Sequence, residues 1–320
     1  MLRRSLLAMP ALLLPVAAQA QRGQAAPQPA EARPLPVVAS FTILADIARQ
    51  VGGERVAVRA IAGPDADAHH FQPRPSAAAA LRGAAVVIRN GLGFDGWMDR
   101  MTRSANWRGP TVTATEGIAP RMVEGGHSHG HGHSHGRAGR PAPDPHCWQD
   151  LAHGRSYART IAAGLAAADP QGAAHYAERA AAYDARLAAL DAEVRAAIAT
   201  VPETRRIVVT SHDAFGYFEI AYGVRFLAPA GVSTTAEPSA QQVARLIRLI
   251  RERNVTALFM ENMSNPATLR RIAAETGVAI GGRLYADSLS GPDGPTPSYE
   301  AMFRHNLALL VPAMRGGGPA

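Results

Sequence analysis

The sequence predicts an α/β protein with two lobes, each a mainly parallel four-stranded sheet with helices, joined by one long helix. Short apolar runs alternate with helical patterns along the chain, which is typical of parallel sheets covered by helices. One apolar stripe at helical spacing continues over 171–200, long enough to brace two lobes. Roughly 300 residues also exceed what one hydrophobic core usually supports.

The first twenty residues predict a secretory signal peptide. Arg3 and Arg4 precede an apolar run over 6–18, and Ala18-Gln19-Ala20 is a typical cleavage site. We therefore expect cleavage after Ala20 and an exported protein. No cysteine stands at the cut, so we expect no lipid anchor, and no later stretch reaches the ~20 apolar residues of a membrane helix. Residues 21–34, rich in Pro, Gln and Ala, predict a disordered lead-in.

The segment 35–170 is expected to form the N-terminal lobe. A strand, a helix stopped by two glycines and a second strand open it, and the pattern then continues to a His-rich loop over 124–137. The expected strands are 35–39, 55–61, 85–88 and 111–114, and the expected helices are 42–51, 76–82 with Ser76 as its cap, 94–104 and 151–168.

The linking helix over 171–200 and the C-terminal lobe over 201–320 follow. The helix carries its apolar stripe on Tyr176, Tyr183, Leu187, Leu190, Val194 and Ile198. The lobe repeats the alternation, with expected strands at 207–210, 224–227, 255–260 and 278–284, and expected helices at 214–222, 239–252, 266–276 and 299–310. No sequence repeat relates the two halves.

The loop over 124–137 is the most unusual stretch. It alternates histidine with Gly and Ser, residues that supply no apolar surface and no helical or strand preference. Neutral imidazole is the commonest ligand for metals such as zinc, so this loop predicts accessory metal capture. A solvated low-complexity insert is the simpler alternative. The histidines are His127, His129, His131, His133 and His135.

Four further polar residues follow predicted strands: His69 the second, His146 the fourth, His212 the fifth and Asp287 the eighth. Ligands bind at the carboxyl ends of strands in open parallel sheets. If the lobes face each other along those ends, three imidazoles and one carboxylate can form a tetrahedral zinc shell. Taken singly, each residue could instead be an ordinary surface or turn residue. His70 competes with His69.

Three other histidines, His153, His175 and His305, fall on predicted helices and receive no function. The only cysteine, Cys147, excludes an internal disulfide and a thiolate-rich zinc site, and we expect it to be a buried apolar residue rather than a ligand. The formal charge of +7 comes from scattered arginines without any lysine, and no basic stripe with interleaved aromatics is present. We therefore expect no nucleic-acid partner.

Several segments, in order, resemble the motifs of the substrate-binding proteins of zinc and manganese ABC transporters. They are GPDADAHHFQP, GLGFDGWMDR, DPHCWQD, TSHDAFGYF, AEPSAQQ, MENMSNPATLRRIAAETG and LYADSLSGPDG. The resemblance covers nearly all of the mature chain. It implies two α/β lobes joined by a long backbone helix, with a metal between them.

The resemblance also implies site residues. His69 matches the family ligand of H-x-[FY]-x-P, His146 that of D-P-H-x-W, and Asp287 that of Y-x-D-S. The third family ligand is commonly His in zinc proteins and Glu in manganese and iron proteins; it is His212 here, which favours zinc. Glu237 and Glu261 are suggested as partners of the ligands. The His-rich loop lacks the acidic residues that often accompany it in zinc members.

The sequence thus predicts a monomeric periplasmic protein that binds Zn²⁺ and delivers it to an inner-membrane ABC permease. A manganese or iron protein of the same class is the nearest alternative, although harder oxygen ligands suit manganese. A periplasmic metal buffer without a transporter is another. A zinc hydrolase would need a positioned base; no His-Glu-x-x-His helix is present, and the consecutive Ser211, His212 and Asp213 cannot form a triad. We therefore expect no enzyme activity. Because imidazoles must be neutral to bind, we expect zinc affinity to fall below about pH 6.5.

Overall fold

The computed structural model describes residues 33–123, 141–234, 236–253, 255 and 257–316. The predicted signal peptide, nearly all of the lead-in and the His-rich loop lie outside these described residues. Among the described residues, no helix is both long and apolar enough to cross a membrane.

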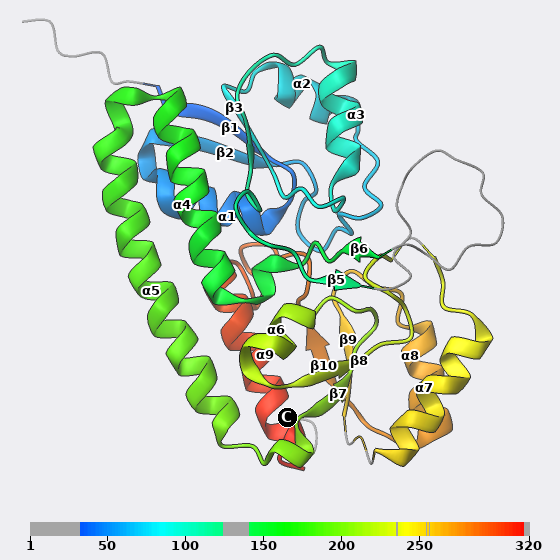
Figure 1. Cartoon of the computed structure of the whole chain (residues 1–320). Coiled ribbons are helices and arrows are strands. Elements are labelled where there is room, and N and C mark those ends of the chain that lie inside the picture. The colour runs from blue at the N-terminus through cyan, green and yellow to red at the C-terminus, as the bar shows by residue number, and fades with distance from the viewer. Residues whose placement is uncertain (1–32, 124–140, 235, 254, 256, 317–320) are drawn as a thin grey trace, which may run out of the picture. The chain divides into compact units, whose positions relative to one another are not determined.

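Two four-stranded sheets organise the chain, and every pairing within them is parallel. The first has the order β2-β1-β3-β4, from Leu35–Ala39 (β1), Val56–Ala60 (β2), Val86–Arg89 (β3) and Thr111–Thr113 (β4). The second has the order β10-β9-β7-β8, from Ile207–Val209 (β7), Arg225–Leu227 (β8), Leu258–Glu261 (β9) and Ile280–Leu284 (β10). The predicted fold class is confirmed. In Figure 1 one sheet lies above the other, and the long helix α5 runs beside both.

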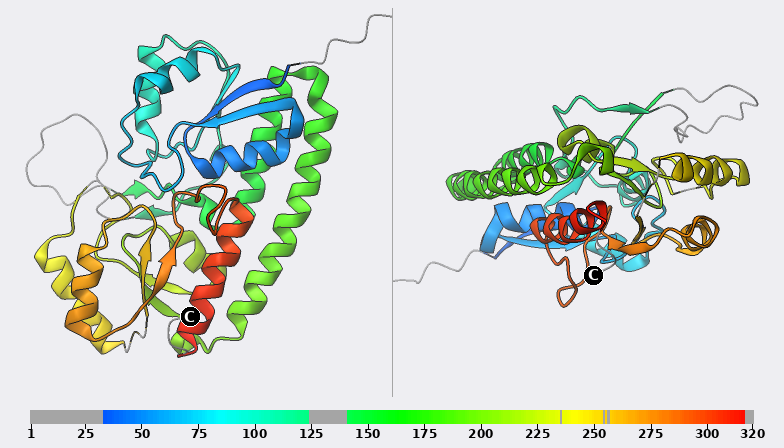
Figure 2. Two further views of the ribbon diagram at one scale, coloured as in Figure 1. Left: turned by 180° about the vertical axis from the view of Figure 1, so that it is seen from behind. Right: turned by 90° about the horizontal axis from the view of Figure 1, so that it is seen from below.

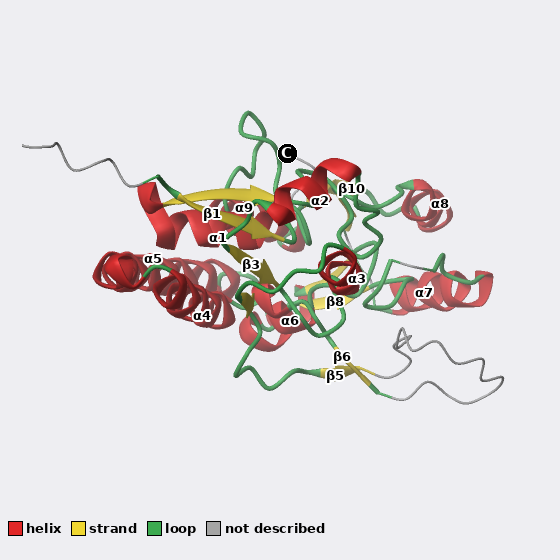
Figure 3. Ribbon diagram, turned by 90° about the horizontal axis from the view of Figure 1, so that it is seen from above, coloured by secondary structure: helices red, strands yellow, loops and turns green. Residues whose placement is uncertain are grey.

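Helices follow most strands, as the alternating pattern predicts. The first half contains Thr42–Gly52 (α1), Pro75–Arg82 (α2), Gly96–Ser104 (α3) and Leu151–Ala168 (α4). The second half contains Gly216–Tyr222 (α6), Ala240–Glu252 (α7), Ala267–Thr276 (α8) and Tyr299–Met314 (α9). Figure 3 shows α4 and α5 side by side on one flank, with α7 and α8 on the opposite flank.

The long helix α5, Ala173–Ala199, joins the two lobes. Its 27 residues give a length of roughly 40 Å at the usual rise of an α-helix. All six residues of the predicted stripe are buried, which confirms the helical period. The helix packs on α1 and α4 of the first half and on α6 and α9 of the second, so a single helix runs along both lobes (Figure 2).

Element ends differ from prediction by a few residues; one helix cap was predicted wrongly, and one pair of short strands was not predicted. Ser76 is not the cap of α2: the helix starts at Pro75, whose fixed φ suits a first helical position, and Arg74 precedes it without a side-chain cap. Short antiparallel strands at Met122–Val123 (β5) and Ala142–Pro143 (β6) were not predicted, because two residues show no periodicity. They flank the His-rich segment in the sequence.

Candidate metal centre

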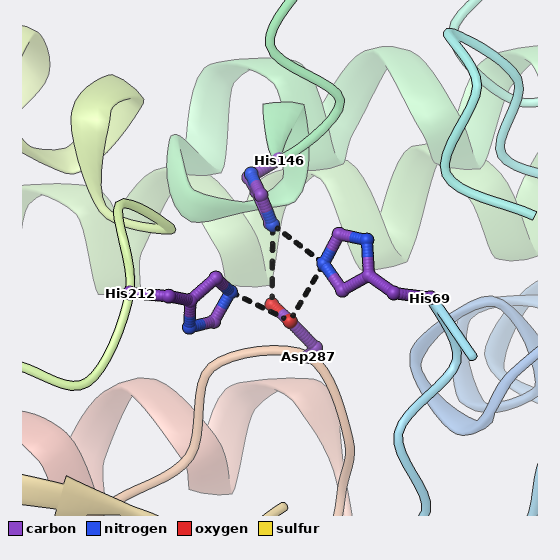
Figure 4. Close-up of side chains that lie close together, drawn as sticks. All are labelled: His69, His146, His212 and Asp287. Carbon is purple, nitrogen blue, oxygen red and sulfur yellow. Dashed lines mark hydrogen bonds and ion pairs between the residues drawn. The ribbon is translucent and has the colours of Figure 1, made fainter. Parts of the chain in front are cut away.

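Four side chains converge between the two sheets: His69, His146, His212 and Asp287 (Figure 4). Each offers one ligand atom, and these atoms all lie within 4.8 Å of one another. His212 and Asp287 each lie three residues beyond a strand of the second sheet, and His69 lies in the loop between β2 and α2. His146 follows β6 rather than β4 directly. The predicted positions just beyond strands agree with the structure for His212 and Asp287, whereas His146 follows a strand that was not predicted.

The distances are those of atoms facing a common centre. His212 Nε2 lies 3.0 Å and His69 Nε2 3.3 Å from Asp287 Oδ2. His146 Nε2 lies 3.6 Å from Asp287 Oδ1 and 3.3 Å from His69 Nε2. Each histidine thus presents the same ring nitrogen, Nε2, to the shared centre.

The centre is buried but incompletely hydrogen-bonded. Among the described side chains, His212 Nε2 and both oxygens of Asp287 are buried atoms without a hydrogen-bond partner, although the ion-pair distance between these residues is short. A buried carboxylate without partners is costly unless a cation compensates it. Three imidazole nitrogens and one carboxylate oxygen fit Zn²⁺, which prefers N and O donors in a tetrahedral arrangement.

Carboxylates behind the ligands fix the orientation of two imidazole rings. Asp144 Oδ1 lies 2.7 Å from His146 Nδ1 and also accepts a hydrogen bond from the backbone N–H of His146. Glu261 Oε2 lies 2.5 Å from His212 Nδ1, and Glu261 Oε1 accepts from the His212 backbone N–H. When Nδ1 donates to a carboxylate, Nε2 keeps its lone pair for a metal.

These carboxylates also shift the pKa values of the metal-free centre. Burial alone lowers the pKa of His146, but Asp287 and Asp144 raise it to about 9. Burial likewise opposes the charge of His212, yet Glu261 and Asp287 raise its pKa well above the ordinary value. The pKa of His69 is lowered, mainly by burial. Burial opposes ionisation of Asp287, but His212 and His146 hold its pKa well below the usual range.

This arrangement predicts that the stability of the metal-free protein depends on pH. His146 has a folded-state pKa of about 9 against an ordinary value of 6.5, so its contribution is complete below about pH 6.5 and disappears as the pH rises through 9. We expect the free energy of unfolding of chelator-treated protein to fall by about 3 kcal/mol from pH 6.5 to 9.5. Urea titrations at each pH measure it.

The metal-loaded protein is the control, because a bound metal would keep the imidazoles neutral and remove this slope. Equal stability of the chelated protein at both pH values would contradict the prediction. The same protons compete with a bound metal, so we expect metal affinity to begin to fall below about pH 9, above the ordinary imidazole pKa of 6.5.

Aromatic rings line one side of the centre, and a cavity borders one of its ligands. Phe94 packs edge-on against His69, with ring centroids 4.5 Å apart, and Trp148 lies 5.2 Å from the His146 ring. A cavity of about 200 Å³ reaches His212 on the other side, lined in part by Asp67 and Glu237. The metal centre therefore has an apolar wall, and one of its ligands borders a cavity.

The other residues considered in the sequence analysis have different environments. His70 is exposed, so His69 is the residue that joins the cluster. Cys147 is fully buried in the core, as expected, and burial raises the pKa of its thiol to about 11. Glu261 contacts a ligand, whereas Glu237 is exposed and lines the cavity. Asp144 was missed, although its place two residues before His146 was a usable signal.

The histidines to which no function was given contact other parts of the chain. His175 Nε2 lies 3.0 Å from the carbonyl oxygen of Gly52, and His305 Nε2 lies 3.0 Å from that of Arg283. His153 packs against the Tyr217 ring. The five histidines over 127–135 lie outside the described residues.

Comparison with known proteins decides the family. Residues 37–313 match the family ZnuA, described as zinc-uptake complex component A, periplasmic. The chain belongs to this family. The family consists of substrate-binding transport proteins rather than enzymes, and its members bind metal ions and work with the permease and ATPase of an ABC transporter. The resemblance found in the sequence motifs is thereby confirmed.

Relatives of the chain carry different metals in their names. This chain is 31% identical over 281 residues to the iron-binding protein YfeA of Yersinia pestis, and the match covers 88% of this chain and 86% of that protein. It is 29% identical over 287 residues to the manganese-binding lipoprotein MntA of Bacillus subtilis, covering 88% and 90%. The periplasmic zinc-binding protein TroA of Treponema pallidum superimposes with a TM-score of 0.78 at 27% identity, covering 88% and 99%.

Proposed function

We propose that this protein binds Zn²⁺ in the periplasm and delivers it to an inner-membrane ABC importer. The observation that carries the proposal is the buried set of three Nε2 atoms and one carboxylate within 4.8 Å. We assign His69, His146, His212 and Asp287 as the zinc ligands. Zinc is the cargo of the protein, which we take to act as a monomer.

The proposal has three steps. The His-rich segment over 124–137 captures zinc weakly and raises its local concentration. The four ligands then bind the ion tightly, with Asp144 and Glu261 holding the rings of His146 and His212. The loaded protein docks on the permease and releases the ion.

The location of the protein follows from the segment before the described residues. We propose that residues 1–20 are a signal peptide cut after Ala20, which agrees with the periplasmic description of the family. We further propose the division into a lobe over 35–170, a linking helix over 171–200 and a lobe over 201–320.

The choice of zinc depends on the donor set. Imidazole nitrogens suit zinc, whereas manganese prefers oxygen ligands, and this centre offers three nitrogens to one carboxylate. A manganese or iron cargo is the second candidate, because relatives with those metals in their names are about 30% identical to this chain.

A metal competition experiment tests the proposal. We expect the mature, metal-free protein to bind one zinc at the centre at least about 100-fold more tightly than manganese, because borderline metals prefer imidazole. Isothermal titration against a competing chelator measures both affinities, and metal analysis of protein purified from the periplasm gives the natural cargo. Equal or tighter manganese binding would favour the second candidate. His212→Glu replaces a nitrogen donor by oxygen donors. This variant is expected to have a smaller ratio of zinc affinity to manganese affinity.

A growth experiment separates delivery from buffering. Deleting the gene is expected to slow growth under zinc starvation, and added zinc restores it. If the protein only stores zinc, its deletion would instead slow growth when zinc is in excess.

A further inference from the structure

Arg121 connects the two halves of the chain directly behind the metal centre. Its Nε donates to Asp144 Oδ2 at 2.9 Å, and its terminal nitrogen lies 3.2 and 3.3 Å from the two carboxylate oxygens of Asp213. Asp144 orients His146, and Asp213 is the chain neighbour of His212. One guanidinium therefore joins the segment that carries one ligand to the segment that carries another.

The position of Arg121 is determined by packing as well as by charge. Its backbone N–H donates to the hydroxyl of Tyr217, which in turn donates to the carbonyl oxygen of Asp144. The guanidinium lies over Gly216, at the start of α6, where an added Cβ would stand 2.1 Å from Arg121 Cζ. Only glycine at this position leaves room for the arginine.

Asp144 is fully buried, and both of its oxygens are used. Oδ1 takes two hydrogen bonds from His146, and Oδ2 takes the one from Arg121. Without Arg121, the carboxylate would lose the partner of one oxygen and could rotate away from His146. A buried polar atom left without its partner is unfavourable, so the orientation of the ring depends on the arginine.

The balance of charge around the centre also involves Arg121. Asp144, Glu261 and Asp287 are three buried carboxylates within the first and second layers of residues around the centre. With neutral imidazoles, a divalent cation compensates two of them. Arg121 supplies a further positive charge, which it shares between Asp144 and Asp213, and its side chain is only 25% exposed.

From these contacts we infer that Arg121 is a positioning residue that sets the rate of metal release. It holds His146 through Asp144, and its ion pair with Asp213 must break before the segments bearing His146 and His212 can separate. Guanidinium suits this role because its planar fork serves two carboxylates at once. The inference rests on the proposed function, since it concerns release of the same ion.

The test measures zinc release into an excess of chelator by stopped flow. Arg121→Gln is expected to release zinc about tenfold faster, the lower end of the effect of losing a partner behind a metal ligand, while still binding one zinc. Gly216→Ala, which keeps the arginine but displaces it, is expected to act in the same direction. Arg121→Lys keeps the positive charge but not the planar guanidinium. Its zinc release rate is expected to lie between those of Arg121→Gln and the unaltered protein.

A matched control is Arg55→Gln. Arg55 also forms a partly buried ion pair, with Asp169 at 2.7 Å and with a side chain 30% exposed, but it lies away from the centre. We expect its release rate to be that of the unaltered protein. If Arg121→Gln and Gly216→Ala also release zinc at the unaltered rate, the inference is wrong.

A spectroscopic readout distinguishes positioning from general stability. In ¹⁵N-histidine NMR of the zinc-bound protein, Arg121→Gln is expected to move the Nδ1 signal of His146. Asp213→Asn speeds release but leaves that signal in place, and this variant keeps the test possible if Arg121→Gln fails to fold. An unmoved His146 signal in folded Arg121→Gln would overturn the positioning role. If the unaltered protein binds no zinc, or His146→Ala retains it, the proposed function fails instead.

Discussion

His146→Ala removes tight metal binding, whereas deletion of residues 125–136 retains it. This is the result we expect, because His146 supplies one of four donors at the buried centre, and the deleted histidines are not among those donors. Structural zinc sites bind with apparent free energies of about 10–16 kcal/mol over four ligands, so one ligand accounts for roughly 3 kcal/mol. The affinity of His146→Ala is therefore expected to drop by at least about 100-fold.

Competitive zinc titration and metal analysis on the mature protein measure both variants. The matched control is His70→Ala, which removes an exposed imidazole next to the proposed ligand His69. We expect it to bind one zinc with unchanged affinity. The deletion is expected to lower only the weak, additional binding. Loss of all tight binding on deletion would mean that the His-rich segment is itself the site and that the four-ligand assignment is wrong.

Zinc is expected to stabilise the folded protein strongly, and Asp287→Asn to abolish that effect. A ligand that binds only the folded state at a thousandfold its Kd adds about 4 kcal/mol of stability. For a chain of this size, that corresponds to a rise in Tm of about 10 °C. Asp287 faces all three imidazoles and supplies the only carboxylate of the centre, so its amide substitute loses charge compensation of the cation.

Thermal unfolding followed by circular dichroism, with zinc or with chelator, gives this difference for each variant. Asp293→Asn is the control: Asp293 lies six residues further along the same connection and is exposed, so the full zinc-dependent rise is expected. A rise of equal size in Asp287→Asn would show that this carboxylate is not a ligand. A water molecule would then complete the shell.

Secondary structure and the approximate place of the centre could be predicted from sequence, because both depend on short-range patterns. The stripe from Tyr176 to Ile198 follows the helical period, and all of its members are buried as expected. Strand-like runs ended close to where His212 and Asp287 stand, and parallel strands bring their carboxyl ends to one edge. Local order along the chain was sufficient for these predictions.

Other features depend on contacts between residues far apart in the chain. The sequence alone could not choose between His69 and His70, since adjacent residues satisfy the same spacing; only the packed loop buries one beside Asp287 and exposes the other. The β5–β6 pair was too short to leave a periodic signal.

The network behind the centre likewise required the tertiary structure. The hydrogen bond between His212 and Glu261 spans 49 residues, and the ion pair between Arg121 and Asp213 spans 92. The sequence by itself determined the strands and helices of the two lobes, apart from the short β5–β6 pair, and the residue types available as donors. Which donors share one buried space, and which carboxylates and arginine hold them, was decided by the packing of the two lobes, because hydrogen-bond geometry and burial exist only in the folded chain.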